Sequence, residues 1–171
     1  ADGKPRNLAR GNGKELASIE QFARQEEVQG EYGGQMASFE YVFSPKGPDG
    51  RPMRLFNRIT GEQDPAVQRA WQKYDIHHIL ESNWANLGPK LKGKLHIFCG
   101  AADTFHLEEA VSLLCNFLKS NGAKAECEIV PGRDHFDLYR RYKSYPEGLD
   151  TRIDEEMQAS ALADSTAEGK R

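Results

Sequence analysis

Residues 90–138, KLKGKLHIFCGAADTFHLEEAVSLLCNFLKSNGAKAECEIVPGRDHFDL, contain the pattern that decides the fold. A nearly continuous apolar run over 95–99 is closed by Gly100, and residues 125–130 (AECEIV) predict a second short strand, closed by Pro131-Gly132. Between them, apolar residues over 107–118 recur at the spacing of an amphipathic helix, which Asn121-Gly122 is expected to end. Short continuous apolar runs are typical of strands buried on both faces. The stretch therefore predicts a βαβ unit with two parallel strands and a right-handed crossover.

The residues before this unit carry helix and loop signals. Residues 1–14 are polar and rich in glycine, which predicts a loop, and apolar residues at helical spacing over 15–29 predict a helix. Asp64-Pro65 and Asp75 are typical of helix starts, and Gly88-Pro89 is expected to end the helix that begins at Asp75. The segment before the βαβ unit is therefore predicted to be mostly helix and loop.

Cysteine content and charge exclude several classes of protein. The chain has 171 residues with three cysteines and no C-x-x-C pair, so neither a disulfide framework nor a thiolate zinc site is predicted. Cys99 and Cys127 are expected to be buried thiols in strands. The net charge is −3, which argues against a nucleic-acid binder. No run of about 18 apolar residues occurs, so no membrane span is predicted.

Two polar loops follow the predicted strands, one with Asp103 and the other with His135. Because parallel strands end at the same edge of a sheet, the two side chains are expected to meet and to form an acid–base pair. The alternatives are that Asp103 only caps the following helix and that His135 is a surface loop residue. Asp134 is expected to form a turn through bonds from backbone N–H groups.

The order strand, Asp, helix, strand, His resembles the second half of the Ser, Asp, His order of α/β-hydrolases. Together with SFEYVFSPKGPDGRP, DPAVQRAWQKYDI and LGPKLKGKLHIF, the chain from about Gly3 to Tyr139 resembles the C-terminal half of bacterial esterases of that superfamily. The resemblance implies that Asp103 is the triad acid and that His135 is the triad base. It also implies that residues 15–87 belong to a helical insertion over the active site.

The nucleophile elbow G-x-S-x-G of such enzymes is absent from the sequence, as is their oxyanion-hole loop. We therefore expect the fold class to be α/β, with the chain as the C-terminal fragment of an α/β-hydrolase. The expected regions are a helical, lid-like part over 1–89, the βαβ part of the sheet over 90–149, and a helix and tail over 150–171. The expected partners are a small-molecule ester substrate and the N-terminal portion of the same protein, which would supply the serine.

The predicted function is carboxylic-ester hydrolysis by a serine esterase, with no cofactor and no metal. One rival is a non-catalytic binding module, which predicts that Asp103 and His135 lie beyond hydrogen-bond reach. A second rival is a peptidase, thioesterase or acyltransferase on the same scaffold.

Other residues that can carry chemistry are expected to have structural roles. His106 and Glu109 are expected to be a solvent-facing pair, because no second matching pair exists. The adjacent pair His77-His78 is not expected to converge on one site, and His96 is expected at a strand edge. Four aromatic residues are expected either to line a substrate pocket or to pack in a core: Phe39, Phe43, Trp71 and Trp84.

Overall fold

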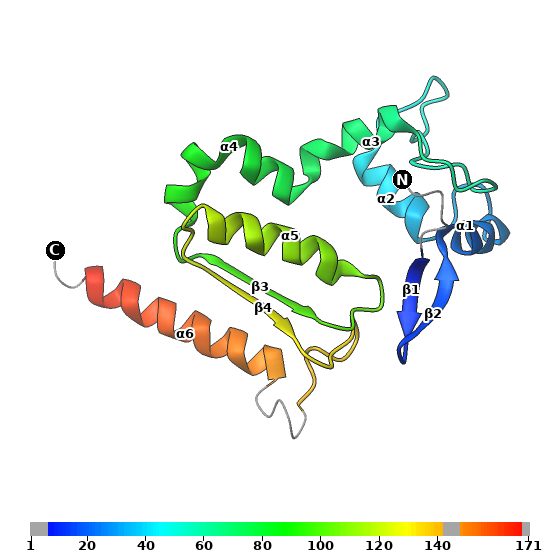
Figure 1. Cartoon of the computed structure of the whole chain (residues 1–171). Helices are drawn as coiled ribbons and strands as arrows, with labels where there is room; N and C mark the ends of the chain where they lie inside the picture. The colour runs from blue at the N-terminus through cyan, green and yellow to red at the C-terminus, as the bar shows by residue number, and fades with distance from the viewer. Residues whose placement is uncertain (1–6, 142–147, 169–171) are drawn as a thin grey trace.

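The computed structural model describes residues 7–141 and 148–168 (Figure 1). It is a mixed α/β structure with one antiparallel and one parallel two-stranded sheet. The strands are β1 (Asn7–Gly11), β2 (Lys14–Ser18), β3 (Leu95–Gly100) and β4 (Ala125–Val130). The helices are α1 (Ile19–Val28), α2 (Gln35–Phe43), α3 (Pro65–Trp71), α4 (Ile76–Leu91), α5 (Leu107–Ser120) and α6 (Gly148–Glu168), with a 3₁₀ turn η1 (Gln72–Tyr74) after α3.

The predicted βαβ unit is confirmed. Strands β3 and β4 are parallel and in register from Leu95 opposite Ala125 to Gly100 opposite Val130. Helix α5 packs on one face of this sheet and α6 lies along the other (Figure 1). Side chains alternate along β4, so Cys127 points toward α5 while its neighbours Glu126 and Glu128 point toward α6. Both faces are thus covered, as the apolar runs predict.

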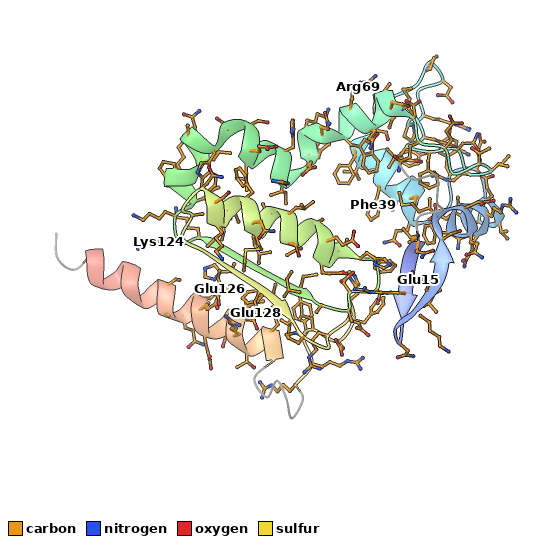
Figure 2. All side chains as sticks on the ribbon, in the orientation of Figure 1. Glu15, Phe39, Arg69, Lys124, Glu126 and Glu128 are labelled. Atoms are coloured by element: carbon orange, nitrogen blue, oxygen red, sulfur yellow. A yellow bond between two sulfur atoms is a disulfide. The ribbon has the colours of Figure 1, made fainter. Side chains whose placement is uncertain are left out.

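Ionic contacts and a small apolar cluster attach α6 to the sheet. Arg152 of α6 pairs with Glu126 and Glu128 of β4, and Figure 2 shows both glutamates on the side of β4 toward α6. The cluster consists of Val130, Leu138 and Leu149 with Phe98 packed against it. The helix predicted within residues 150–171 is present, and it starts two residues before that range, at Gly148.

An antiparallel hairpin of β1 and β2 replaces the predicted loop over 7–14, whereas residues 1–6 lie outside the described residues. Its turn is Asn12-Gly13, with φ of 50° and 71°. Positive φ at both central residues is the geometry of the two-residue turn that matches strand twist, and Asn-Gly is its preferred sequence. This dipeptide was the local signal for the hairpin, and the lack of apolar alternation around it concealed the strands.

The helix predicted over 15–29 begins instead at Ile19. The Ser18 hydroxyl accepts a hydrogen bond from the Gln21 backbone N–H at 3.2 Å, and the Ser18 N–H donates to the Gln21 side chain at 2.8 Å. This reciprocal capping box satisfies two N–H groups of the first turn. It fixes the helix start four residues later than the apolar spacing suggested.

The helix starts predicted at Asp64-Pro65 and Asp75 are confirmed. The Asp64 carboxylate accepts from the first-turn N–H groups of α3, and the Asp75 carboxylate accepts from the His78 N–H at 3.2 Å. The predicted stop at Gly88-Pro89 is wrong, because α4 continues to Leu91. The helix is instead interrupted at Asn83, which has φ of −139°, and Pro89 lies near the end of the segment that follows. Within the described ranges, no helix has both the length and the apolarity to cross a bilayer.

Arg58 and Glu40 form a buried ion pair in the N-terminal part of the chain. The Arg58 guanidinium donates to both Glu40 carboxylate oxygens, at 3.1 and 2.7 Å, and the two side chains are 2% and 0% exposed. Glu40 also accepts from the Leu55 N–H, and Glu26 lies 4.0 Å from Arg58. One arginine thus joins α1, α2 and the loop after α2 through two buried carboxylates.

The cysteine expectation is corrected at one pair. Cys115 of α5 and Cys127 of β4 form a disulfide with a Cα–Cα distance of 5.9 Å, whereas Cys99 is a buried free thiol, as predicted. The helix folds back onto the strand that follows it, which brings two cysteines 12 residues apart into bonding range. Sequence spacing alone carries no information on this packing.

Replacing Cys115 and Cys127 by serine together is expected to lower the free energy of unfolding by about 2–3 kcal/mol, because the bond closes a short loop in the unfolded chain. Urea unfolding of the oxidised protein and of the double variant measures the difference. The Cys99→Ser variant is the control, because it replaces a buried cysteine that forms no disulfide. A thiol titration of the urea-unfolded, unreduced chain that finds three reactive thiols instead of one would contradict the bond.

Candidate functional site

The two predicted functional loops leave the parallel sheet at one edge. Asp103 lies in the turn after β3, and His135 lies in the turn after β4. The strands end opposite one another, with Gly100 paired to Val130. Each side chain is therefore only a few residues from the shared edge of the sheet.

Asp103 and His135 are hydrogen-bonded. The distance from His135 Nδ1 to Asp103 Oδ2 is 3.0 Å. The other carboxylate oxygen, Oδ1, accepts from the backbone N–H groups of Phe105 and Leu107, at 2.9 and 3.3 Å. The carboxylate therefore accepts from the first N–H group of α5 and orients the histidine at once, so the two roles considered for Asp103 are not exclusive.

The His135 ring is held between two aromatic rings and keeps one nitrogen open. Phe105 and Phe136 approach it edge to face, with centroid distances of 4.9 and 5.1 Å. The side chain is 37% exposed, and Nε2 has no hydrogen-bond partner among the residues that the structure describes. A carboxylate on Nδ1 favours the tautomer with the proton on Nδ1. The lone pair of Nε2 is then available to accept a proton.

The two loops approach closely because position 100 has no side chain. A Cβ on Gly100 would lie 2.4 Å from the carbonyl oxygen of Arg133, well inside van der Waals contact with main chain. The Arg133 carbonyl instead accepts from the Ala102 N–H at 2.8 Å. Asp134 forms the predicted turn, since its carboxylate accepts from the N–H groups of Phe136 and Asp137.

Arg10 of β1 contacts the same loop, and the sequence analysis did not identify it. Its side chain donates to the carbonyl oxygens of Asp103 and Ala101, at 3.0 and 3.1 Å, and pairs with Glu108 at 2.5 Å. Its backbone N–H donates to the Thr104 carbonyl at 2.8 Å. These contacts join residues more than 90 positions apart, so no local sequence pattern predicts them.

Cys99 is a buried residue near the end of β3, and its surroundings keep its thiol protonated. Burial, followed by the carboxylates of Asp103 and Glu108, raises the pKa of the Cys99 thiol from 9.0 to about 11. Alkylation by iodoacetamide at pH 9 is therefore expected to proceed at about one-fiftieth of the rate of the unfolded chain, because about half of the unfolded thiol but only about 1% of the folded thiol is ionised, and to accelerate toward pH 11.

The same shift links the Cys99 thiol to stability. The unfolded chain releases the thiol proton at lower pH than the folded chain, so the free energy of unfolding is expected to fall as the pH rises from about 9 to 11.

Mass spectrometry of the alkylated protein, with and without denaturant, measures the rate at which Cys99 is labelled. Equal labelling rates in the folded and unfolded chain at pH 9 would contradict the shift.

Two other groups of side chains have the composition of metal ligands, with ligand atoms within 4.8 Å of one another. One is His96, Glu126 and Glu156, and the other is His106, Glu108 and Glu109. In the first group Arg152 already pairs with both glutamates. In the second group Glu108 is engaged by Arg10. Arg152 and Arg10 thus already neutralise carboxylates that a metal ion would otherwise bind.

The remaining predicted residues are distributed over the chain. The prediction of a solvent-facing His106 is wrong: the residue precedes α5 with φ of 58°, and its side chain is only 19% exposed, whereas Glu109 is exposed. Trp84 packs edge to face on Phe117, which joins α4 to α5. Phe43 and Trp71 line a surface pocket of about 390 Å³ together with Tyr74.

Comparison with family models, curated protein sequences and solved structures returns no match to this chain. The assignment of a function therefore depends on the geometry of the site.

Proposed function

We propose that this chain supplies Asp103 and His135 to the Ser–His–Asp triad of a carboxylic-ester hydrolase of the α/β-hydrolase type. The observation that carries the proposal is the 3.0 Å hydrogen bond between His135 Nδ1 and Asp103 Oδ2. A non-catalytic module of the same outline predicts these atoms beyond bonding distance. The open Nε2 adds support, because a triad base needs one nitrogen for its carboxylate and the other for the nucleophile.

The serine is proposed to come from polypeptide outside this sequence. The sequence contains no G-x-S-x-G, and the parallel sheet has two strands within the described part of the chain. Parallel sheets normally have more strands, because each strand needs paired edges and covered faces. The outer sides of β3 and β4, where each strand could form backbone hydrogen bonds with another strand, are therefore suited to further strands, one of which would carry the nucleophile.

The reaction follows from the position of Nε2. As the serine oxygen bonds to the ester carbonyl carbon, Nε2 takes the serine proton, and the Asp103 carboxylate stabilises the resulting imidazolium. The tetrahedral intermediate collapses by breaking the bond to the alcohol oxygen, which receives the proton from Nε2. Water then attacks the acyl-serine while Nε2 takes its proton, and the proton returns to the serine as the acid leaves. These reaction steps need no metal and no cofactor.

The test uses the complete open reading frame that encodes this sequence, expressed as one protein. We expect it to hydrolyse p-nitrophenyl acetate and to be labelled on one serine by a fluorophosphonate probe, whereas the 171-residue chain alone is expected to do neither. Absence of labelling in the complete protein would contradict the proposed class of reaction. Hydrolysis by the chain alone that His135→Ala abolishes would contradict the external serine.

A further inference from the structure

We infer that Arg10 is a positioning residue for the Asp103–His135 pair, acting through the carbonyl oxygens of the loop that carries Asp103. The inference rests on the proposed function, because positioning matters only if the pair performs proton transfer. It assigns a role to the β1–β2 hairpin, which lies beside the loop between β3 and α5 (Figure 1).

The contacts of Arg10 are directed at the main chain around Asp103. The guanidinium spans the peptide carbonyls of Ala101 and Asp103, two residues apart, at 3.1 and 3.0 Å. The planar guanidinium presents several donors in a fixed arrangement, so it can hold both carbonyls at a set separation. A lysine has no comparable planar group of donors.

The hairpin makes further contacts with the loop that carries Asp103, through the Arg10 main chain and through Glu15. Besides the Arg10 N–H bond to Thr104, Glu15 of β2 lies opposite Arg10 in the hairpin and approaches His106 Nε2 at 3.5 Å. The hairpin thus contacts the loop on both sides of Asp103. These bonds complement those of Asp103 itself, which fix its carboxylate against the first turn of α5.

Burial makes the Arg10 contacts consequential. The Arg10 and Glu108 side chains are 24% and 15% exposed, and the Arg10 bond to the Asp103 carbonyl is partly buried, whereas its bond to the Ala101 carbonyl is exposed. Loss of a side chain that bonds a partly buried carbonyl leaves that carbonyl without its donor. The loop is then expected to relax, and Asp103 Oδ2 moves away from His135 Nδ1. A displacement on the order of 1 Å at such a site can cost about 100-fold in rate.

The first test measures the pair itself and requires no activity. In the chain alone, the Nδ1 proton of His135 is expected to give a downfield proton NMR signal, because the carboxylate slows its exchange with water. Arg10→Met is expected to broaden or abolish this signal, and Arg10→Lys to restore it only in part. Glu108→Gln removes the ion pair but keeps both carbonyl contacts, so the signal is expected to persist.

Arg24→Met is the matched control, because Arg24 forms an exposed ion pair with Glu20 on α1 and, among the described residues, makes no contact with the loop that carries Asp103. An amide proton–nitrogen spectrum shows whether each variant is folded. An unchanged Nδ1 signal in folded Arg10→Met overturns the inference. Absence of the signal in the unaltered chain instead argues against the Asp103–His135 bond, and thus against the proposed function.

The second test uses the complete enzyme. Arg10→Met is expected to lower kcat by about 10- to 100-fold with KM little changed, since the residue touches no substrate. A rise in KM at constant kcat would overturn the positioning role.

Discussion

Replacing His135 by alanine in the complete enzyme is expected to lower kcat for p-nitrophenyl acetate by about 10⁴-fold or more, because the serine loses the base that takes its proton. Steady-state kinetic assays on the purified proteins measure this loss of kcat. His78→Ala is a suitable control, because His78 is an exposed histidine on α4. A loss below about tenfold in His135→Ala would contradict the triad assignment.

Asp103→Asn provides a sharper version of the same experiment. Oδ1 of Asp103 accepts two backbone N–H bonds, so an asparagine at this position keeps its oxygen there and turns its NH₂ group toward His135 Nδ1. The amide then donates to Nδ1, and the imidazole proton moves to Nε2, which is the wrong tautomer for a base. The expected loss of kcat is about 10⁴-fold with α5 still capped. Retained activity would argue that Asp103 acts only as a helix cap.

The largest expected effect on stability belongs to the buried Arg58–Glu40 pair. Arg58→Met leaves the carboxylates of Glu40 and Glu26 without their cation in a buried site, and it is expected to cost about 3–5 kcal/mol of unfolding free energy. Urea unfolding followed by circular dichroism measures the change.

Arg54→Met is the matched control for Arg58→Met. Arg54 pairs with Glu27 and lies at the surface with 28% of its side chain exposed, so its loss is expected to cost at most about 1 kcal/mol. Equal costs for the two variants would contradict the special role of burial.

The parallel unit and its helices were predictable because their signals are local. The apolar run of β3, the short segment of β4 closed by Pro131-Gly132, the periodicity of α5, and the capping residues Asp64 and Asp75 each act within a few positions of the chain. The proximity of Asp103 and His135 followed from a general property of parallel strands, without any knowledge of side-chain packing.

The features that were missed depend on contacts between distant segments or on competing local bonds. The Cys115–Cys127 bond depends on the docking of α5 on β4, and the role of Arg10 depends on a hairpin more than 90 residues away. Pro89 was predicted to end α4, yet the helix is interrupted earlier, at Asn83. The disulfide and the contacts of Arg10 are set by tertiary structure, which overrides the weak preferences of single residues.

The close approach of the Arg133 main chain to Gly100 also bears on how this protein can evolve. Every missense change in the codon for Gly100 introduces a Cβ where backbone already lies, and it therefore separates the two loops whatever the new side chain is. Purifying selection at this codon is expected to be as strong as at the codons for Asp103 and His135, although Gly100 performs no chemistry.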